Sequence, residues 1–276
     1  MAYRRLDKIS SWRRLAVGMW GAPSNPTAQG VREVDLSKTL PFMEEVSEKT
    51  GQKITVTHMF VAAMGRVLAK YPEYNVILRR NVPYRRETAD VFVQVAIKGA
   101  DGRADLSGIK IESADKLTVE EISGKIAKRA ARVRAGRDKD IEKAKGGVAR
   151  IPPMVLRPTI KALTSLSYDF NLDLSFLGIK KDPFGAAMIT NVGGFGIPHA
   201  LVPLLPTSRI GILFCLGMIH DRPHVIDGKV EVRPTLIMTG SLDHRVLDGF
   251  QIGNITVLLD HIVSNPDEYP DLTKAL

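Results

Sequence analysis

The stretch Asp243-His244-Arg245-Val246-Leu247-Asp248-Gly249 comes shortly after the apolar run Pro234–Thr239. Such a run predicts a buried strand, which places His244 on a loop at the end of that strand. A loop held by a rigid sheet can aim an imidazole while keeping its tip accessible, as a general base requires. A single histidine in a turn is also a common structural residue, so the stretch by itself leaves both interpretations open.

The segments around this stretch predict further strands. Each apolar pattern in the C-terminal third of the chain is bounded by turn residues. The expected elements are a strand at Ala187–Thr190 before the glycine-rich turn Asn191–Gly196, a strand at Ile210–Ile219, a hairpin at His224–Val232 that turns on Asp227-Gly228, and a helix at Phe250–Val263.

The N-terminal two-thirds of the chain alternates helical and strand patterns. A capping-box signature at Thr118–Glu121 opens a long amphipathic helix. Without repeats or a clear linker, the mixture predicts one α/β domain over residues 1–276. The other expected elements are a helix from Ser10 or Ser11 to Trp20, a strand at Val31–Asp35, helices at Leu36–Gly51 and Thr57–Tyr71, and a strand at Val91–Ile97.

The charge of the chain narrows the classes of partner. The formal net charge is +9, which favours anionic partners such as nucleic acid, a membrane surface, phosphorylated cofactors or acidic protein domains. Basic residues concentrate at 125–137 with no aromatic residue between them, whereas nucleic-acid-binding modules usually interleave stacking aromatics. We therefore expect a solvated helix face there and no nucleic-acid partner.

Targeting and ligand signals are weak. The N-terminus is charged and leads into no apolar core of signal-peptide length, and no stretch reaches transmembrane length. The single cysteine, Cys215, lies in an apolar run and is expected to be a buried small hydrophobe. The histidines show no metal-ligand spacing with acids or cysteines, so no metal is expected. These features favour a cytoplasmic protein without a transmembrane segment.

Residues 151–179 form an apolar segment that is too interrupted to span a bilayer. Two interpretations are compatible with it. The favoured one is extra core that packs against its own domain. The other is a partner-binding or membrane-surface amphipathic element.

Four segments in order carry a family resemblance. The stretch 243–249 resembles the Asp-His-Arg-x-x-Asp-Gly signature of the catalytic domain of dihydrolipoamide acyltransferases, the core subunits of 2-oxo acid dehydrogenase complexes. Residues 189–196 resemble the family's Ile-Ser/Thr-Asn-x-Gly-x-x-Gly segment, and residues 8–14 and 72–75 resemble its opening. The resemblance implies the fold that this family shares with chloramphenicol acetyltransferase, a two-layer sandwich of a mixed sheet and helices.

The resemblance also implies a chemistry, which is coenzyme A-dependent transfer of an acyl group between two thiols. His244 would be the general base that deprotonates the attacking thiol, since the thiolate is the nucleophile. Thr190 would stabilise the oxyanion of the tetrahedral intermediate. By analogy with the family, Asp248 is an anchor that pairs with an arginine, Arg13 or Arg14, and fixes the loop that carries His244.

Assembly and cofactor binding follow from the same resemblance. It implies a homotrimer in which His244 of one chain faces Thr190 of the next, with coenzyme A and lipoamide entering from opposite sides. Asn191, Gly193 and Gly194 would lie near the pantetheine arm, where glycines permit close backbone approach.

Two departures from the family bear on the substrate. The chain begins at the catalytic domain, so the acyl acceptor is expected to be a lipoyl domain of another chain or a small molecule. The stretch of about 138–183 is longer than the family's usual link and predicts an insertion that could reshape the channel, block assembly into a larger core or dock a partner. The alternative function is a non-catalytic trimeric scaffold derived from the same family.

Overall fold

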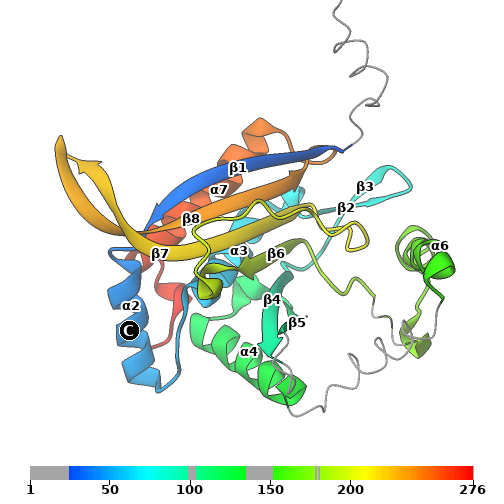
Figure 1. The fold of residues 1–276 in the computed structure, drawn as a ribbon, viewed down its shortest axis with the longest axis horizontal. Helices are drawn as coiled ribbons and strands as arrows, with labels where there is room; N and C mark the ends of the chain where they lie inside the picture. Colours follow the sequence, from blue (N-terminus) through cyan, green and yellow to red (C-terminus); the bar gives the residue numbers. More distant parts are fainter. Residues whose placement is uncertain (1–24, 99–103, 135–151, 178, 180, 276) are drawn as a thin grey trace, which may run out of the picture.

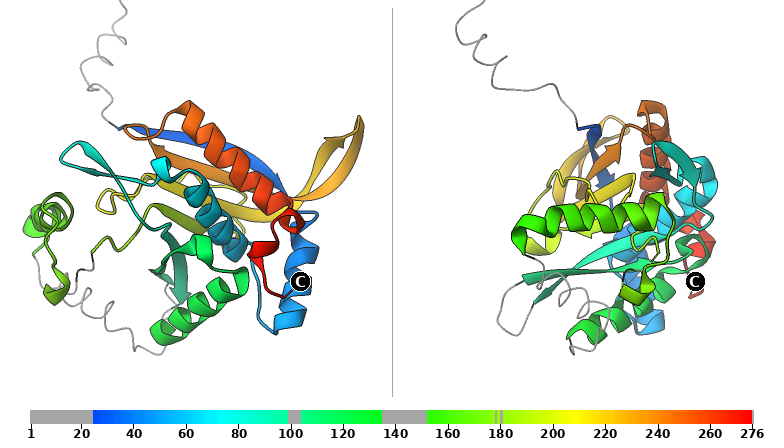
Figure 2. Two further views of the ribbon diagram at one scale, coloured as in Figure 1. Left: turned by 180° about the vertical axis from the view of Figure 1, so that it is seen from behind. Right: turned by 90° about the vertical axis from the view of Figure 1, so that its right-hand side faces the viewer.

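A six-stranded mixed sheet forms the centre of the molecule (Figures 1 and 2). The computed structural model describes residues 25–98, 104–134, 152–177, 179 and 181–275. The strand order is β1-β8-β7-β6-β4-β5, with β6 parallel to β7 and to β4 and the other neighbours antiparallel. The strands are β1 Thr27–Asp35, β4 Val91–Lys98, β5 Ala104–Ile111, β6 Ala187–Asn191, β7 Ile212–Ile226 and β8 Lys229–Asp243.

Helices cover one face of the sheet, so the expected two layers are present. The predicted helices are confirmed to within a few residues, except that the one expected near Ser10–Trp20 lies outside the described residues. A small second sheet pairs β2 with β3. The bounds are α2 Thr39–Thr50, α3 Val56–Lys70, α4 Val119–Arg134, α6 Pro153–Thr164, α7 Gly249–Ser264, β2 Val76–Arg79 and β3 Val82–Arg85.

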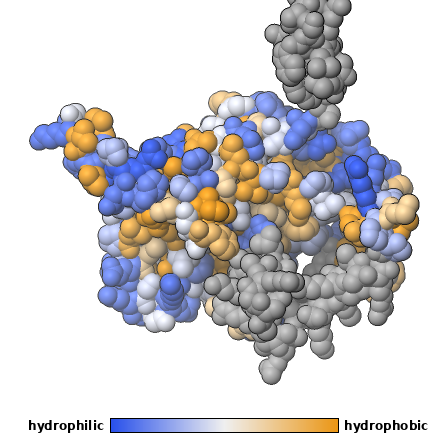
Figure 3. Space-filling view, viewed as in Figure 1, coloured by the Kyte–Doolittle hydropathy of each residue, from blue (hydrophilic) through white to orange (hydrophobic). Residues whose placement is uncertain are grey.

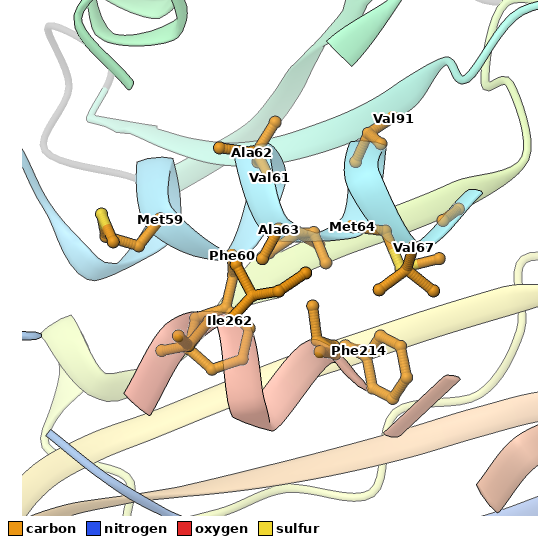
Figure 4. Packing of buried hydrophobic residues seen from close by; sticks show 14 of the residues in the cluster. Met59, Phe60, Val61, Ala62, Ala63, Met64, Val67, Val91, Phe214 and Ile262 are labelled. Atoms are coloured by element: carbon orange, nitrogen blue, oxygen red, sulfur yellow. The ribbon is translucent and has the colours of Figure 1, made fainter. Parts of the chain in front are cut away.

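The main core lies between α3 and the sheet. In α3 the large side chains of Met59, Phe60 and Met64 are fully buried and pack with Ile262 of α7 and Phe214 of β7 (Figure 4). Each such side chain contributes about 1.5–3 kcal/mol by leaving water. Met59 and Met64 are therefore core residues, and α3 packs closely against this side of the sheet.

A capping box begins α3. The Thr55 side chain accepts from the backbone N–H of His58, and His58 Nδ1 accepts from the Thr55 backbone N–H at 3.1 Å. Because the ring is buried, the pKa of His58 is lowered to about 4. The neutral imidazole is thus the form that this helix start uses.

The β7–β8 hairpin is longer than the sequence predicts. Its turn falls on Asp227-Gly228 as predicted, with both residues at positive φ (49° and 77°). The separate strands expected on either side merge into two strands of 15 residues each. Beyond Thr235 the hairpin has left both β1 and β6, so Pro223 and Pro234 lie where a missing N–H interrupts no third strand.

A smaller cluster covers the opposite face of the sheet. Met188, Leu213 and Cys215 pack beneath the loop that follows β6, against Ala200, Val202 and Leu204. Cys215 is 1% exposed, which confirms the buried small hydrophobe that the sequence predicted. Burial raises the pKa of its thiol.

The segment 152–177 is only partly the extra core that the sequence favoured. Ser167, Tyr168 and Leu174 are buried, as extra core would be. The helix α6, however, has no buried residue at all, and it lies at the edge of the molecule in both figures (Figures 1 and 2). The favoured interpretation as core is therefore wrong for α6. In the part of the chain that the structure describes, no helix is long and apolar enough to cross a membrane.

Candidate active site

His244 lies on a tight turn directly after β8, and its side chain is exposed. The turn is held on several sides. The backbone N–H of His244 donates to Pro26 O at 2.8 Å, and that of Asp243 donates to Gly211 O at 3.0 Å. The N–H groups of Val246 and Leu247 both donate to Asp243 O at 3.1 Å. The sequence prediction of an accessible imidazole at a strand end is confirmed.

Asp243 and Arg245 form an ion pair around the histidine. Asp243 Oδ1 accepts from the backbone N–H and from Nε of Arg245, at 3.1 and 2.9 Å, and its Oδ2 accepts from Nη2 at 2.6 Å. Burial alone raises the pKa of Asp243, but the hydrogen bonds and the charge of Arg245 outweigh this and hold the pKa below its ordinary value. The carboxylate is therefore ionised near neutral pH and closes the turn that carries His244.

Sequence reasoning did not assign a role to this pair. Asp243 and Arg245 entered the prediction only as parts of the 243–249 signature. The signal that could have identified them is their spacing, because an acid and an arginine on either side of one residue in a tight turn can meet across it.

Asp248 caps the helix that follows the turn of His244. It is the N-cap of α7, and its Oδ1 accepts from the backbone N–H groups of Phe250 and Gln251 at 2.9 and 3.1 Å. The Gln251 side chain accepts in return from the Asp248 N–H, which completes a capping box. Asp248 therefore anchors the loop through the helix. The expected partners, Arg13 and Arg14, lie outside the described residues.

Thr190 lies near the end of β6 and is 8% exposed. It shares a face of the strand with Met188, because side chains two apart on a strand point to the same side. The Thr190 side chain therefore lies on the face of the sheet that the loop after β6 covers, beside Cys215 of β7. A hydroxyl there is shielded from water, which suits a donor to a developing charge.

Asn191 and the two glycines form the turn after Thr190. Asn191 Nδ2 donates to Thr57 Oγ1 at 3.1 Å, and Asn191 Oδ1 accepts from the Gly193 N–H at 2.8 Å. A Cβ on Gly193 would lie 2.5 Å from Gly217 O, so packing against β7 already requires this glycine. A Cβ on Gly194 would meet nothing within 4 Å. Of the two glycines, only Gly194 leaves open space for a ligand.

The sheet register separates Thr190 from His244 within one chain. Thr190 pairs with Cys215, which pairs with Thr239 two strands away from β6. Asp243 lies four residues further along β8, which is a displacement of roughly 13 Å along the strand direction. The two strand spacings between β6 and β8 add roughly 10 Å across the sheet. The two backbones are thus about 16 Å apart. One substrate carbon cannot contact both side chains of the same chain.

No metal-binding group forms among the described residues, where no three His, Cys, Asp or Glu side chains cluster together. His224 Nε2 lies 2.7 Å from Thr235 Oγ1, and His261 Nδ1 lies 3.0 Å from the Tyr269 hydroxyl. These histidines have structural partners in the protein. His244 differs from them in lying on a turn directly after a strand of the central sheet.

Known proteins resemble the chain over most of its length. The model of the family "2-oxoacid dehydrogenases acyltransferase (catalytic domain)" matches residues 8–150 and 184–269. The acetyltransferase component of the Zymomonas mobilis pyruvate dehydrogenase complex is 24% identical over 85% of this chain and 43% of its own length. The succinyltransferase component of the Rickettsia typhi 2-oxoglutarate dehydrogenase complex is 24% identical over 86% and 49%. The chain thus spans about half the length of these curated relatives.

Solved structures show the same fold. The cubic core of the pyruvate dehydrogenase multienzyme complex aligns with a TM-score of 0.61 at 17% identity, covering 96% of this chain and 94% of that one. A truncated catalytic core of the Thermoplasma acidophilum 2-oxoacid dehydrogenase complex aligns with a TM-score of 0.59 at 19% identity, covering 96% and 100%. The family match covers well over half of the sequence. The chain therefore belongs to the family of 2-oxoacid dehydrogenase acyltransferase catalytic domains.

Proposed function

We propose that this protein transfers an acyl group between coenzyme A and a thiol acceptor such as dihydrolipoamide, with His244 as the general base. The observation that supports this most directly is the fixed turn that presents an exposed imidazole at the end of β8. Exposure leaves the ring nitrogen accessible to a thiol. The bonds to Pro26 O and Gly211 O keep the backbone of the turn in place while the proton moves.

His244 begins the reaction by accepting the proton of the attacking thiol. The thiolate adds to the thioester carbonyl, and the negative charge moves to the former carbonyl oxygen. Thr190 donates its hydroxyl proton in a hydrogen bond to that oxygen, a contribution on the order of 3–4 kcal/mol for one such donor. When the intermediate collapses, the other thiolate leaves and recovers the proton from the imidazolium.

The site of this reaction lies between two copies of the chain. About 16 Å separates Thr190 from the turn of His244 in one copy, so the two groups meet only if Thr190 is supplied by a neighbour. A closed ring of three copies, each placing its His244 end against the Thr190 end of the next, satisfies this requirement for every copy. The relative whose core is described as cubic is itself a multi-subunit assembly.

A related enzyme supports the choice of residues. The Azotobacter vinelandii dihydrolipoamide acetyltransferase was investigated for the roles of a serine, a histidine and an asparagine in its catalytic mechanism. Thr190, His244 and Asp248 are the corresponding kinds of residue in the matching motifs of this chain. Threonine retains the hydroxyl of serine. Asp248 replaces an amide by a carboxylate and serves here as a helix cap.

Coenzyme A is the proposed acyl carrier, with its pantetheine arm near Asn191, Gly193 and Gly194. Support comes from the open space over Gly194. The acceptor is proposed to be the lipoyl group of another chain or a small thiol. The proposed location is the cytoplasm, where the chain would bind neither nucleic acid nor metal.

Acyl exchange between acyl-coenzyme A and dihydrolipoamide tests the proposal. His244→Ala should lower kcat by about 10²–10⁴-fold without loss of folding, because the side chain is exposed. His261→Ala, which removes another exposed histidine, serves as the matched control and should leave the rate unchanged. The proposal fails if the purified protein exchanges no acyl group, or if the two variants behave alike. Coenzyme A binding measured by calorimetry separates an inactive scaffold, which would show none, from an enzyme with another acceptor.

A further inference from the structure

The segment 152–177, called the arm below, is attached to the rest of the domain over a short stretch, and large apolar side chains are exposed on both sides of that stretch. The anchor lies at Tyr168 and Asp169. Arg79 Nε donates to Tyr168 O at 2.7 Å, and the Tyr168 hydroxyl donates to Ser208 O at 3.1 Å. Asp169 Oδ2 accepts from Arg209 Nη2 at 3.0 Å. Two ordered elements of the domain, β2 and the chain before β7, thus hold the base of the arm.

This anchor lies beside the His244 end of the sheet. Ser208 and Arg209 are followed by Gly211, whose carbonyl accepts from the N–H of Asp243. The segment 208–211 therefore contacts both the arm and the turn that carries His244. The anchor of the arm therefore lies close to the place where Thr190 of a neighbouring copy is proposed to bind against His244.

Beyond its anchor, the arm exposes large apolar side chains. Met154 is 92% exposed and Phe176 is 77% exposed, although fully burying either kind of side chain is worth about 1.5–3 kcal/mol. Val155, Leu166 and Leu172 are exposed as well. At the edge of the molecule where α6 lies, Figure 3 shows hydrophobic and hydrophilic residues side by side. Several large apolar side chains exposed on one segment favour an interaction surface.

A second apolar surface lies at the opposite end of the sheet, next to Thr190. Phe195, Ile197 and Leu201 of the loop after β6 are exposed by 57%, 39% and 52%. The N–H of Met218 donates to Ile197 O at 2.9 Å, which holds this loop on β7. Two different apolar surfaces at opposite ends are what a head-to-tail contact between identical copies requires.

We infer that the arm is an intersubunit clasp that docks on the Phe195–Leu201 surface of a second copy of this chain. The inference rests on the proposed function, because that function brings the Thr190 end of one copy against the His244 end of another. The family model matches residues 8–150 and 184–269 and leaves the whole arm outside. The clasp is thus an addition of this chain to the shared domain, and it closes one side of the site that it borders.

Subunit mass as a function of protein concentration tests the clasp. Met154→Glu combined with Phe176→Glu places two charges in the proposed contact. Both side chains are exposed in the single chain, so folding should be preserved, as thermal unfolding will show. We expect the midpoint of trimer dissociation to move to at least tenfold higher protein concentration. Val257→Glu is the matched control, because Val257 is an apolar residue of α7 that is 55% exposed and far from the arm in sequence.

A photo-crosslinking residue in place of Phe176 identifies the occupant directly. In a mixture of isotopically light and heavy chains, the clasp predicts cross-links from position 176 to peptides containing 193–205 of the other isotope. Trimers that cross-link only within one chain, or that keep their dissociation midpoint in the double variant, would overturn the clasp and leave the proposed function intact. Binding of the wild-type protein to anionic phospholipid vesicles that is lost in the double variant, without a change in subunit mass, would assign the arm to a membrane surface and also overturn it. A wild-type protein that is active but monomeric at every concentration would overturn the clasp and the shared site together.

Discussion

Asp243 controls the geometry of the turn that carries His244 more directly than any other side chain described near it. Its carboxylate accepts hydrogen bonds from the backbone N–H, Nε and Nη2 of Arg245, and its backbone carbonyl accepts two more from Val246 and Leu247. His244 lies between the two members of the pair. Fixing the backbone on both sides of a residue limits the positions that its side chain can take, and misplacement of a catalytic group by about 1 Å can cost on the order of 10²-fold in rate.

Asp243→Asn should therefore act on turnover more than on substrate binding. The amide keeps the shape of the side chain but loses the charge that attracts Arg245, which weakens charge-assisted hydrogen bonds of about 1.5–3 kcal/mol. We expect kcat to fall by about tenfold, equivalent to about 1.4 kcal/mol, with little change in KM for acyl-coenzyme A. Steady-state kinetics measures the split. Arg245→Gln, which removes the same pair from the other side, should reproduce the effect, and a rise in KM alone would contradict the positioning role.

At the scale of one element, the start of α3 links pH to stability. The pKa of His58 in the folded protein is about 4, against 6.5 for an ordinary histidine, because burial disfavours the charged ring. The unfolded chain therefore binds the proton more readily. Above pH 6.5 this residue does not affect the free energy of unfolding, and between pH 6.5 and about 4 it lowers that energy progressively, by on the order of 3 kcal/mol in total.

His58→Gln should remove this sensitivity while keeping the cap. A glutamine at the third helical position accepts from the N-cap N–H as His58 does, and it does not titrate. Urea unfolding at pH 7, 5.5 and 4.5 should show the variant gaining stability relative to the wild type as the pH falls. His58→Ala provides the control, since it loses the cap at every pH. A constant difference between His58→Gln and the wild type across this range would mean that His58 is not the titrating group.

The same element shows which part of the fold the sequence could predict. The helical spacing of Met59, Phe60 and Met64 identified α3 because its core-facing pattern is strong and local. The capping box at Thr118 identified the start of α4, where the Thr118 N–H donates to Glu121 Oε2 at 3.0 Å. Strand β5 was missed because Gly108 interrupts its pattern. That glycine is required, since a Cβ there would lie 2.2 Å from the ring of Phe92 on the neighbouring strand.

Residues of the candidate site were predictable one at a time, but their arrangement was not. His244 and Thr190 stand out through local motifs, and the structure confirms that both lie at strand ends. Their separation depends on the register of β6, β7 and β8, which long-range pairing sets. The exposure of α6 likewise depends on what the rest of the chain leaves available to cover it. A local sequence pattern determines neither the separation of His244 and Thr190 nor the exposure of α6.

At the scale of the whole molecule, an active site shared between copies predicts complementation between two inactive variants. His244→Ala chains still supply Thr190, and Thr190→Ala chains still supply His244. In trimers formed from an equal mixture, about a quarter of the interfaces join an intact His244 to an intact Thr190, because each interface draws its two sides independently from two kinds of chain. Activity should therefore recover to about 25% of the wild type after the mixed chains are dissociated and reassembled.

The activity of each variant alone should lie below that of the wild type by about 10²–10⁴-fold for His244→Ala and by about 10²–10³-fold for Thr190→Ala. The recovered activity would therefore be easy to measure. Mixing the two proteins without dissociating them is the control, and it should give only the sum of the residual rates. A site contained within one chain predicts no recovery under either condition. Because the sheet separates the two groups by about 16 Å, recovery on reassembly is the outcome that this topology requires of an active enzyme.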